Sequence, residues 1–244
     1  MKTRTKLLVA IISVLFVVLM CALGFSILAS GISNSRRATL RTTCASRLKT
    51  VGVLVAAYAA QYDDALPATG VPGGTWMCDQ PPEWASVGGS AAVAGFSFPD
   101  VNYCPANTHQ DPAVLWGGAA APYRVTGYVW TNERPGMPPL AGLRATPPLE
   151  YRKRFSTVRS AAESELALDW IISNSPAAAG ASWTGITAAG RPGVYDTSHL
   201  VGTAPAGGNV LTLDGAVMWR PFDPARSTAV AQSPSGPAFW FPGK

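Results

Sequence analysis

The sequence predicts an α+β protein in which one long N-terminal helix packs against a small antiparallel β-sheet. Three observations point to this fold class. The chain opens with an apolar stretch, residues 7–32, and a second stretch with helical periodicity, residues 33–66, follows it directly. The remainder consists of short runs of β-branched and aromatic residues between turns, and 24 glycines and 21 prolines are too many for a helical bundle. Because the predicted strands follow the helix and do not alternate with helices, α+β fits better than α/β.

Residues 7–32 are expected to form a transmembrane helix. They include no charged residue and no proline, and about 20 such residues are enough to cross a bilayer. A cleavable signal peptide has a shorter apolar region ending in small residues, which Ala29-Ser30-Gly31 imitates, but the length of the run favours a retained anchor. We expect a single-pass protein of the cytoplasmic (inner) membrane, with residues 1–6 in the cytoplasm and the C-terminal domain extracytoplasmic. Basic residues flank the span on both sides, so charge counting alone does not fix this orientation.

The distribution of charge argues against nucleic acid as a partner. Residues 1–50 contain eight basic side chains and no acidic one, whereas residues 51–244 contain 11 basic and 14 acidic side chains. Basic groups beside an apolar helix suit lipid headgroups. The outer domain has an acidic balance and offers no basic surface to follow phosphates. The expected partner is therefore the lipid bilayer.

The helix is expected to continue through residues 33–66 with one apolar face. Beyond the span, apolar residues recur at steps of three and four, which is the spacing of one helix face, and one helix is expected from residue 7 to about residue 62. Asp63 and Asp64 then precede Pro67, the first proline of the chain. These carboxylates could hold a structural calcium ion, but a helix end in solvent explains them equally well. The predicted packing face consists of Leu40, Cys44, Leu48, Val51, Val55, Tyr58 and Tyr62.

Residues 67–220 are expected to form the outer β domain, and residues 221–244 an irregular tail rich in proline, serine and alanine. Residues 123–131 and 165–172 are rich in β-branched and aromatic residues, as strands are.

The strongest local signal in this domain is Asp214-Gly215. It is flanked by residues 209–213 and 216–220, two short apolar runs. This pattern predicts a hairpin with a two-residue turn, in which both central residues adopt a positive φ.

The cysteines of the outer part leave the disulfide connectivity open. Cys44 belongs to the helix stripe and is expected to be buried and unpaired, so the favoured pair in an oxidising compartment is Cys78 with Cys104. The same two cysteines and His109 could supply three zinc ligands, but the paired C-x-x-C spacing is missing. A disulfide is favoured, and neither a metal nor a cofactor is expected.

No catalytic motif stands out. The chain lacks H-E-x-x-H, G-x-S-x-G and a phosphate-binding glycine loop. Ser198, His199 and Asp214 could be combined as a triad, but the side chains of adjacent Ser and His seldom converge in that way. The sequence therefore predicts a protein that is not an enzyme.

Three stretches resemble the type IV pilins and the pseudopilins of type II secretion. The closer resemblance is to bacterial pseudopilin-like proteins that end in a His…Asp-Gly motif. This resemblance implies the predicted fold, contacts with other pilin-like subunits through the N-terminal helix, and a structural role for the motif. Fourteen residues lie between His and Asp-Gly here, more than in the family, which indicates an inserted loop. The stretches are Cys44 to Gly52 running on to Pro67, Cys104-Pro105, and His199 with Gly207, Gly208, Asn209, Asp214 and Gly215.

Prepilins have Gly-Phe and a Glu at the start of the apolar helix. Here the span contains no Glu, and Gly24-Phe25 lies inside it. Cleavage by prepilin peptidase, and with it filament assembly, therefore stays open.

The expected function is that of a non-enzymatic, membrane-anchored structural or assembly component of a secretion or surface apparatus. The alternative is a membrane-tethered binding module, for example for glycans, in which aromatic side chains stack on sugars. The candidate stacking residues are Trp76, Trp84, Trp116 and Trp130.

Overall fold

The computed structural model describes most of the chain and divides it into two compact units, residues 1–40 and residues 41–244. Both units contain part of one helix. The described residues are 2–67, 76–82, 84–87, 98–117, 122–131, 154, 165–187, 191, 193–231 and 237–243.

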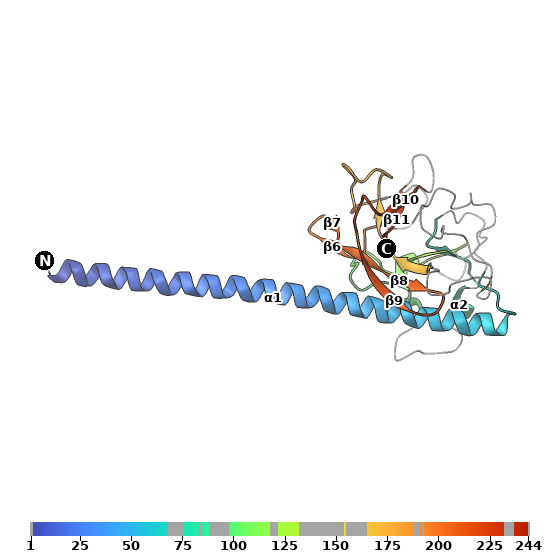
Figure 1. Ribbon diagram of the computed structural model, residues 1–244, viewed down its shortest axis with the longest axis horizontal. Helices are drawn as coiled ribbons and strands as arrows, with labels where there is room; N and C mark the ends of the chain where they lie inside the picture. Colours follow the sequence, from blue (N-terminus) through green and yellow to red (C-terminus); the bar gives the residue numbers. More distant parts are fainter. Residues whose placement is uncertain are drawn as a thin grey trace. The chain divides into compact units, whose positions relative to one another are not determined.

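Helix α1 runs without interruption over Lys2–Gln61 (Figure 1). Its stretch Ser13–Gln61 is the one helix among the described residues that is long and apolar enough to cross a membrane. Large apolar side chains in this stretch, such as Phe16, are exposed to the extent of 62%. The expected long helix is thus confirmed.

The end of α1 depends on left-handed backbone at two aspartates. Asp63 and Asp64 have φ values of 52° and 64°, and the amide of Asp64 donates to the carbonyl of Ala59 at 2.8 Å. Aspartate tolerates this conformation better than most residues. The Asp63 carboxylate lies 3.2 Å from the Arg154 guanidinium. The two aspartates therefore have a structural role at the helix end.

The central element is a four-stranded antiparallel sheet with the order β3-β4-β8-β9. Its strands are β3 (Tyr128–Trp130), β4 (Glu165–Asp169), β8 (Gly207–Thr212) and β9 (Val217–Pro221). The four predicted strand regions of the sheet are present, and β8 and β9 form the predicted hairpin.

Among the described residues, the domain also contains smaller sheets and three short helices. The smaller sheets consist of β1 (Asp79–Gln80) with β2 (Arg124–Val125), of β5 (Ile172–Ser173) with β10 (Thr228–Ala231) and β11 (Ala238–Phe241), and of β6 (Leu200–Val201) with β7 (Ala204–Pro205). The helices are α2 (Trp84–Val87), α3 (Phe98–Val101) and α4 (Pro112–Leu115).

The expected irregular tail is wrong for the described part of residues 221–244. Strands β10 and β11 lie there, and Phe239, Trp240 and Phe241 are buried. Burial of three consecutive aromatic side chains outweighs the turn-forming composition around them. Residues 232–236 and residue 244 lie outside the described residues.

Both faces of strands β3, β4 and β8 are buried. On the face toward α1, Tyr128, Trp130, Ala167 and Leu211 join the core cluster that contains the helix residues. The other face presents Val129, Leu168 and Val210 to a second cluster built around Trp170, Tyr195 and Phe239. The alternation along these three strands therefore directs successive side chains to one core or the other.

The helix stripe meets the sheet over its middle part. Cys44, Leu48, Val51 and Val55 are fully buried, whereas Leu40 and Tyr58 are half-buried. Tyr62, at the end of the predicted face, is 53% exposed and stacks on Tyr58.

The helix and the sheet approach closely at Gly52, which the predicted stripe did not include. A Cβ atom at Gly52 would lie 2.8 Å from a methyl carbon of Leu211. The result is a long N-terminal apolar helix packed through its C-terminal part on antiparallel sheets. This α+β arrangement is a pilin-like architecture.

The packing face predicts that the same substitution has different effects on stability at two valines of α1. Val51→Asp should lower the free energy of unfolding by about 4 kcal/mol, because it buries an unpaired carboxylate. Val53, which is 60% exposed, is the matched control, and Val53→Asp should change stability by less than about 0.5 kcal/mol. Urea unfolding of the full chain in detergent micelles measures both values. Equal losses for the two variants would contradict this assignment of the face.

The hairpin turn differs in detail from the expected two-residue turn. The amide of Gly215 donates to the carbonyl of Thr212 at 2.9 Å, so Leu213 and Asp214 are the central residues of the turn. Of these residues only Gly215 has a positive φ, 80°. This is the three-residue loop that ends in a left-handed glycine, the next most common hairpin connection after the two-residue turns.

Gly215 is expected to contribute to stability only through its backbone conformation. A Cβ atom there would meet nothing within 4 Å, so Gly215→Val should cost about 1–2 kcal/mol through the left-handed φ. Asparagine tolerates this region, and Gly215→Asn should cost clearly less. Thermal melting of both variants tests the prediction. A turn without positive φ would show no difference between them.

Candidate functional site

Four side chains from neighbouring strands form one row across the sheet on the face toward α1. The register pairs Trp219 of β9 with Asn209 of β8, and Tyr128 of β3 with Asp169 of β4. The backbone and side-chain amides of Asn209 both reach the Asp169 carboxylate. A buried carboxylate therefore lies in the middle of an otherwise apolar interface.

Asp169 is fully buried and receives several donors. Its Oδ2 accepts from the backbone N–H of Asn209 at 2.7 Å and from Asn209 Nδ2 at 2.8 Å, and lies 3.0 Å from His199 Nε2. Such donors offset the cost of removing a carboxylate from water. Burial, and then the Asp169 charge, raise the pKa of Tyr128 well above its usual value. The phenol at the end of the row is therefore neutral.

His199 comes from the segment that precedes β6. The amide of Ser198 donates to the carbonyl of Trp170 at 2.9 Å, and the amide of Ala206 donates to the carbonyl of His199 at 2.8 Å. The edge of the imidazole ring meets the Trp219 ring at a centroid distance of 5.1 Å. These contacts direct Nε2 toward Asp169.

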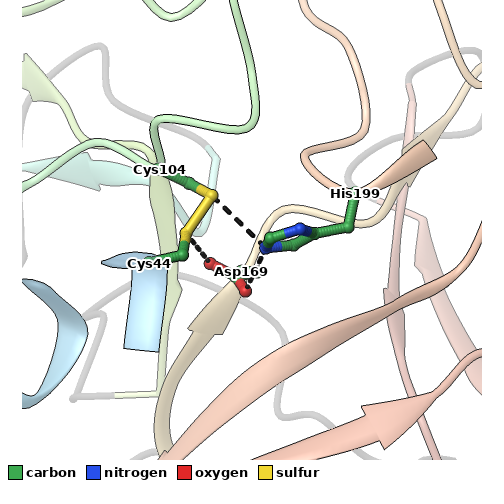
Figure 2. Close-up of side chains that lie close together, drawn as sticks. All are labelled: Cys44, Cys104, Asp169 and His199. Atoms are coloured by element: carbon green, nitrogen blue, oxygen red, sulfur yellow. Dashed lines mark hydrogen bonds and ion pairs between the residues drawn. A yellow bond between two sulfur atoms is a disulfide. The ribbon is translucent and has the colours of Figure 1, made fainter. Parts of the chain in front are cut away.

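A disulfide between Cys44 and Cys104 closes the site (Figure 2). Cys44 Sγ lies 3.1 Å from Asp169 Oδ1, and Cys104 Sγ lies 3.3 Å from His199 Nε2. Because disulfide sulfurs have no proton to donate, the hydrogen between His199 and Asp169 belongs on Nε2. Cys104 Sγ is then a weak second acceptor for it.

The disulfide corrects two expectations: Cys44 is not unpaired, and Cys104 is not bonded to Cys78. Cys44 and Cys104 belong to the core cluster on the helix side of the sheet. Cys78 belongs to the cluster on the other side, so it cannot reach Cys104. The bond joins α1 to the segment after α3 across 60 residues of sequence. A loop of that length corresponds to about 4 kcal/mol of stabilisation in the chain-entropy account.

The glycines of the His…Asp-Gly motif make room for this row. A Cβ atom at Gly207, whose φ is 148°, would lie 2.7 Å from the Trp219 ring. A Cβ atom at Gly208 would lie 3.3 Å from the Cβ of Asp169. The guanidinium of Arg41 in turn covers the Trp219 ring at 4.2 Å. The motif thus makes room for the row formed by Trp219, Asn209, Asp169 and Tyr128 on the face toward α1.

The structure does not bring the suggested triad together. The Asp214 carboxylate accepts from the Thr212 hydroxyl at 2.5 Å and from the Ala216 amide at 3.0 Å, at the exposed hairpin turn. These two hydrogen bonds, the Thr212 hydroxyl first, lower the pKa of Asp214. The carboxylate beside His199 is that of Asp169. Asp169 was missed by sequence reasoning, although an aspartate within an apolar strand is a recognisable signal.

The suggested zinc ligands are also separated. His109 Nδ1 lies 2.5 Å from Asp196 Oδ2, and Cys104 is bonded to Cys44 rather than placed beside Cys78.

The candidate stacking tryptophans are mostly inaccessible. Trp76, Trp84 and Trp130 are buried, and Trp116 is half-buried with Phe98 at its edge.

A buried ion pair elsewhere in the domain was also not foreseen. Arg191 pairs with Asp79, and its guanidinium covers the Trp76 ring at 3.9 Å. Burial and this carboxylate oppose each other, and the net effect is a raised Arg191 pKa. The pair lies on the side of the sheet away from α1, with Cys78 and Tyr195.

Comparisons with protein-family models, with curated proteins and with solved structures found no match to this chain.

The two histidines of the chain provide a matched test of the site. Each pairs with an aspartate, but the side chain of His199 is 7% exposed and that of His109 is 58% exposed. His199→Ala should lower the free energy of unfolding by about 1–3 kcal/mol, because it removes a buried donor from Asp169. His109→Ala should cost less than about 1 kcal/mol. Urea unfolding followed by tryptophan fluorescence measures both values, and a larger effect at His109 would contradict this account.

Proposed function

We propose that the protein is a non-enzymatic, pseudopilin-like component of a secretion or surface apparatus, anchored in the cytoplasmic membrane with its domain outside. One observation supports this most directly. Helix α1 is a single helix that provides both an exposed apolar segment and the packing face of the folded domain. Anchor and domain are therefore one continuous element and not two modules joined by a flexible linker.

The exposed apolar segment needs an environment other than water. Each large apolar side chain left in water forgoes about 2 kcal/mol, and Val14 to Leu19 are all more than half exposed. Lipid, or the helices of other subunits, supplies that environment. Ala22, Ser26 and Ser30 recur at every fourth residue, a spacing that lets membrane helices approach closely.

The disulfide supports an extracytoplasmic location of the domain. Stable disulfides form in oxidising compartments and are rare in the cytoplasm. The Cys44–Cys104 bond therefore favours translocation of the C-terminal domain. Charge counting had left this orientation open.

The hydrogen bonds around Asp169 support a structural role for the His…Asp-Gly motif. Asp169 takes its donors from Asn209 and His199, so these groups satisfy one another. Burial of Trp76, Trp84 and Trp130 disfavours the glycan-binding alternative, since a stacking platform must be open to the sugar.

Cross-linking at Cys21 tests the anchor and the assembly together. Cys21 is exposed on α1, Cys78 is buried, and Cys44 and Cys104 are bonded to each other. A short membrane-permeant bismaleimide should therefore join two copies through Cys21. Membranes that contain the full chain should show a dimer on a denaturing gel, and Cys21→Ser should abolish it.

Because neighbouring helices can meet on another face, the cysteine is also moved in turn to Ala22, Leu23 and Gly24 in the Cys21→Ser background. One of the four positions should cross-link most strongly. Monomer at all four positions would refute assembly through the helix. The intact mass of membrane-extracted protein should include residues 1–32, and a new N-terminus between Ser26 and Asn34 would refute the anchor.

A further inference from the structure

The disulfide, Asp169 and His199 form a potential metal site whose four side chains come from separate segments. Cys44 lies on α1, Cys104 follows α3, Asp169 ends β4 and His199 precedes β6 (Figure 2). One ligand atom from each lies within 4.8 Å of all the others, and all four residues are buried. Sequence reasoning had combined Cys104 with other partners.

The distances in this cluster are close to those between the ligand atoms of a tetrahedral zinc site. Zinc with bonds of about 2.0–2.3 Å to N, O and S holds its ligand atoms roughly 3.3–3.8 Å apart. Cys44 Sγ lies 3.1 Å from Asp169 Oδ1, and Cys104 Sγ lies 3.3 Å from His199 Nε2. His199 Nε2 lies 3.0 Å from Asp169 Oδ2, the other carboxylate oxygen. Two of these contacts are slightly shorter than that range, and the two sulfurs are far too close because they are bonded to each other. Opening that bond is therefore the one chemical change that the site needs.

We propose that the reduced protein binds one zinc ion through Cys44 Sγ, Cys104 Sγ, His199 Nε2 and the Asp169 carboxylate. Two thiolates favour zinc over magnesium and calcium, which prefer oxygen ligands. Asn209 donates to Asp169 Oδ2 through two N–H groups and leaves Oδ1, the oxygen beside Cys44, directed at the ion. Asn209 therefore acts as a positioning residue behind the ligand.

The conversion balances with a dithiol as reductant. The dithiol transfers two electrons and two protons to the Cys44–Cys104 bond and becomes a disulfide itself, which leaves two protein thiols. Zinc then replaces the two thiol protons, which pass to solvent. The His199 proton moves from Nε2 to Nδ1, so that Nε2 offers its lone pair. Oxidation by a small-molecule disulfide reverses the first step after zinc has left.

The two states would join the same elements in different ways. In the oxidised protein a covalent bond ties α1 to the segment after α3. In the reduced protein the ion would tie α1, that segment, β4 and the loop before β6 together, and a structural zinc site contributes folding energy outright. The interface between helix and sheet would thus be held in either redox state.

The test compares oxidised and reduced full-length protein in detergent micelles. The protein is reduced with dithiothreitol in urea, freed of the dithiol without oxygen, and refolded with or without zinc chloride. After gel filtration, the reduced protein should contain one zinc per chain and the oxidised protein none. Reduced protein refolded with zinc should melt at a higher temperature than reduced protein without it. Cobalt(II) in place of zinc should give the absorption bands of thiolate coordination.

Variants distinguish this site from adventitious binding. His199→Ala should weaken zinc binding by more than about 100-fold, and Asn209→Ala by about 10- to 100-fold. His109→Ala and Cys78→Ser should keep one zinc per chain. Equal zinc in the His199→Ala and His109→Ala proteins, loss of zinc in Cys78→Ser, or failure of the reduced protein to refold with zinc would each overturn the proposal.

Discussion

The buried carboxylate of Asp169 is the group on which the arrangement of the domain depends. A carboxylate inside an apolar interface is tolerated only where donors surround it. Two of these donors belong to Asn209 on the next strand and one to His199 on a distant loop. Strand pairing, loop position and the approach of Cys44 on α1 must therefore all be correct at once. Such a group favours one packing of helix on sheet over its alternatives.

The two parts of helix α1 differ in what surrounds their apolar side chains. Its first part exposes apolar side chains, whereas Cys44 to Val55 present their apolar face to the sheet. Both parts belong to one uninterrupted helix, Lys2–Gln61. The disulfide makes the second part inseparable from the domain. These properties are compatible with the proposed role, in which the N-terminal helix anchors the domain.

Local patterns allowed the helix, the middle of its buried face and the β8–β9 hairpin to be predicted. The 3.6-residue periodicity and an Asp-Gly turn act within a few residues of sequence. The disulfide did not follow, because Cys44 was assigned to an apolar face and a cysteine on such a face was taken to be unpaired. Which cysteine pairs with Cys44 depends on the side of the sheet on which each segment lies, and no local sequence pattern predicts that. The role of Asp169 was missed for the same reason, as its partners are 30 and 40 residues away.

The register of the β8–β9 hairpin links the two ends of the His…Asp-Gly motif. Gly215 allows a three-residue turn, and this turn pairs Leu211 with Val217 and, two residues further on, Asn209 with Trp219. A slip of one residue would move Asn209 to the opposite face of β8 and put an apolar neighbour against Asp169. The donors of the carboxylate would then be lost, and His199 would meet no ordered partner. The exposed turn at Asp214-Gly215 and the buried histidine, far apart in sequence, are therefore parts of one arrangement that fixes where the helix meets the sheet.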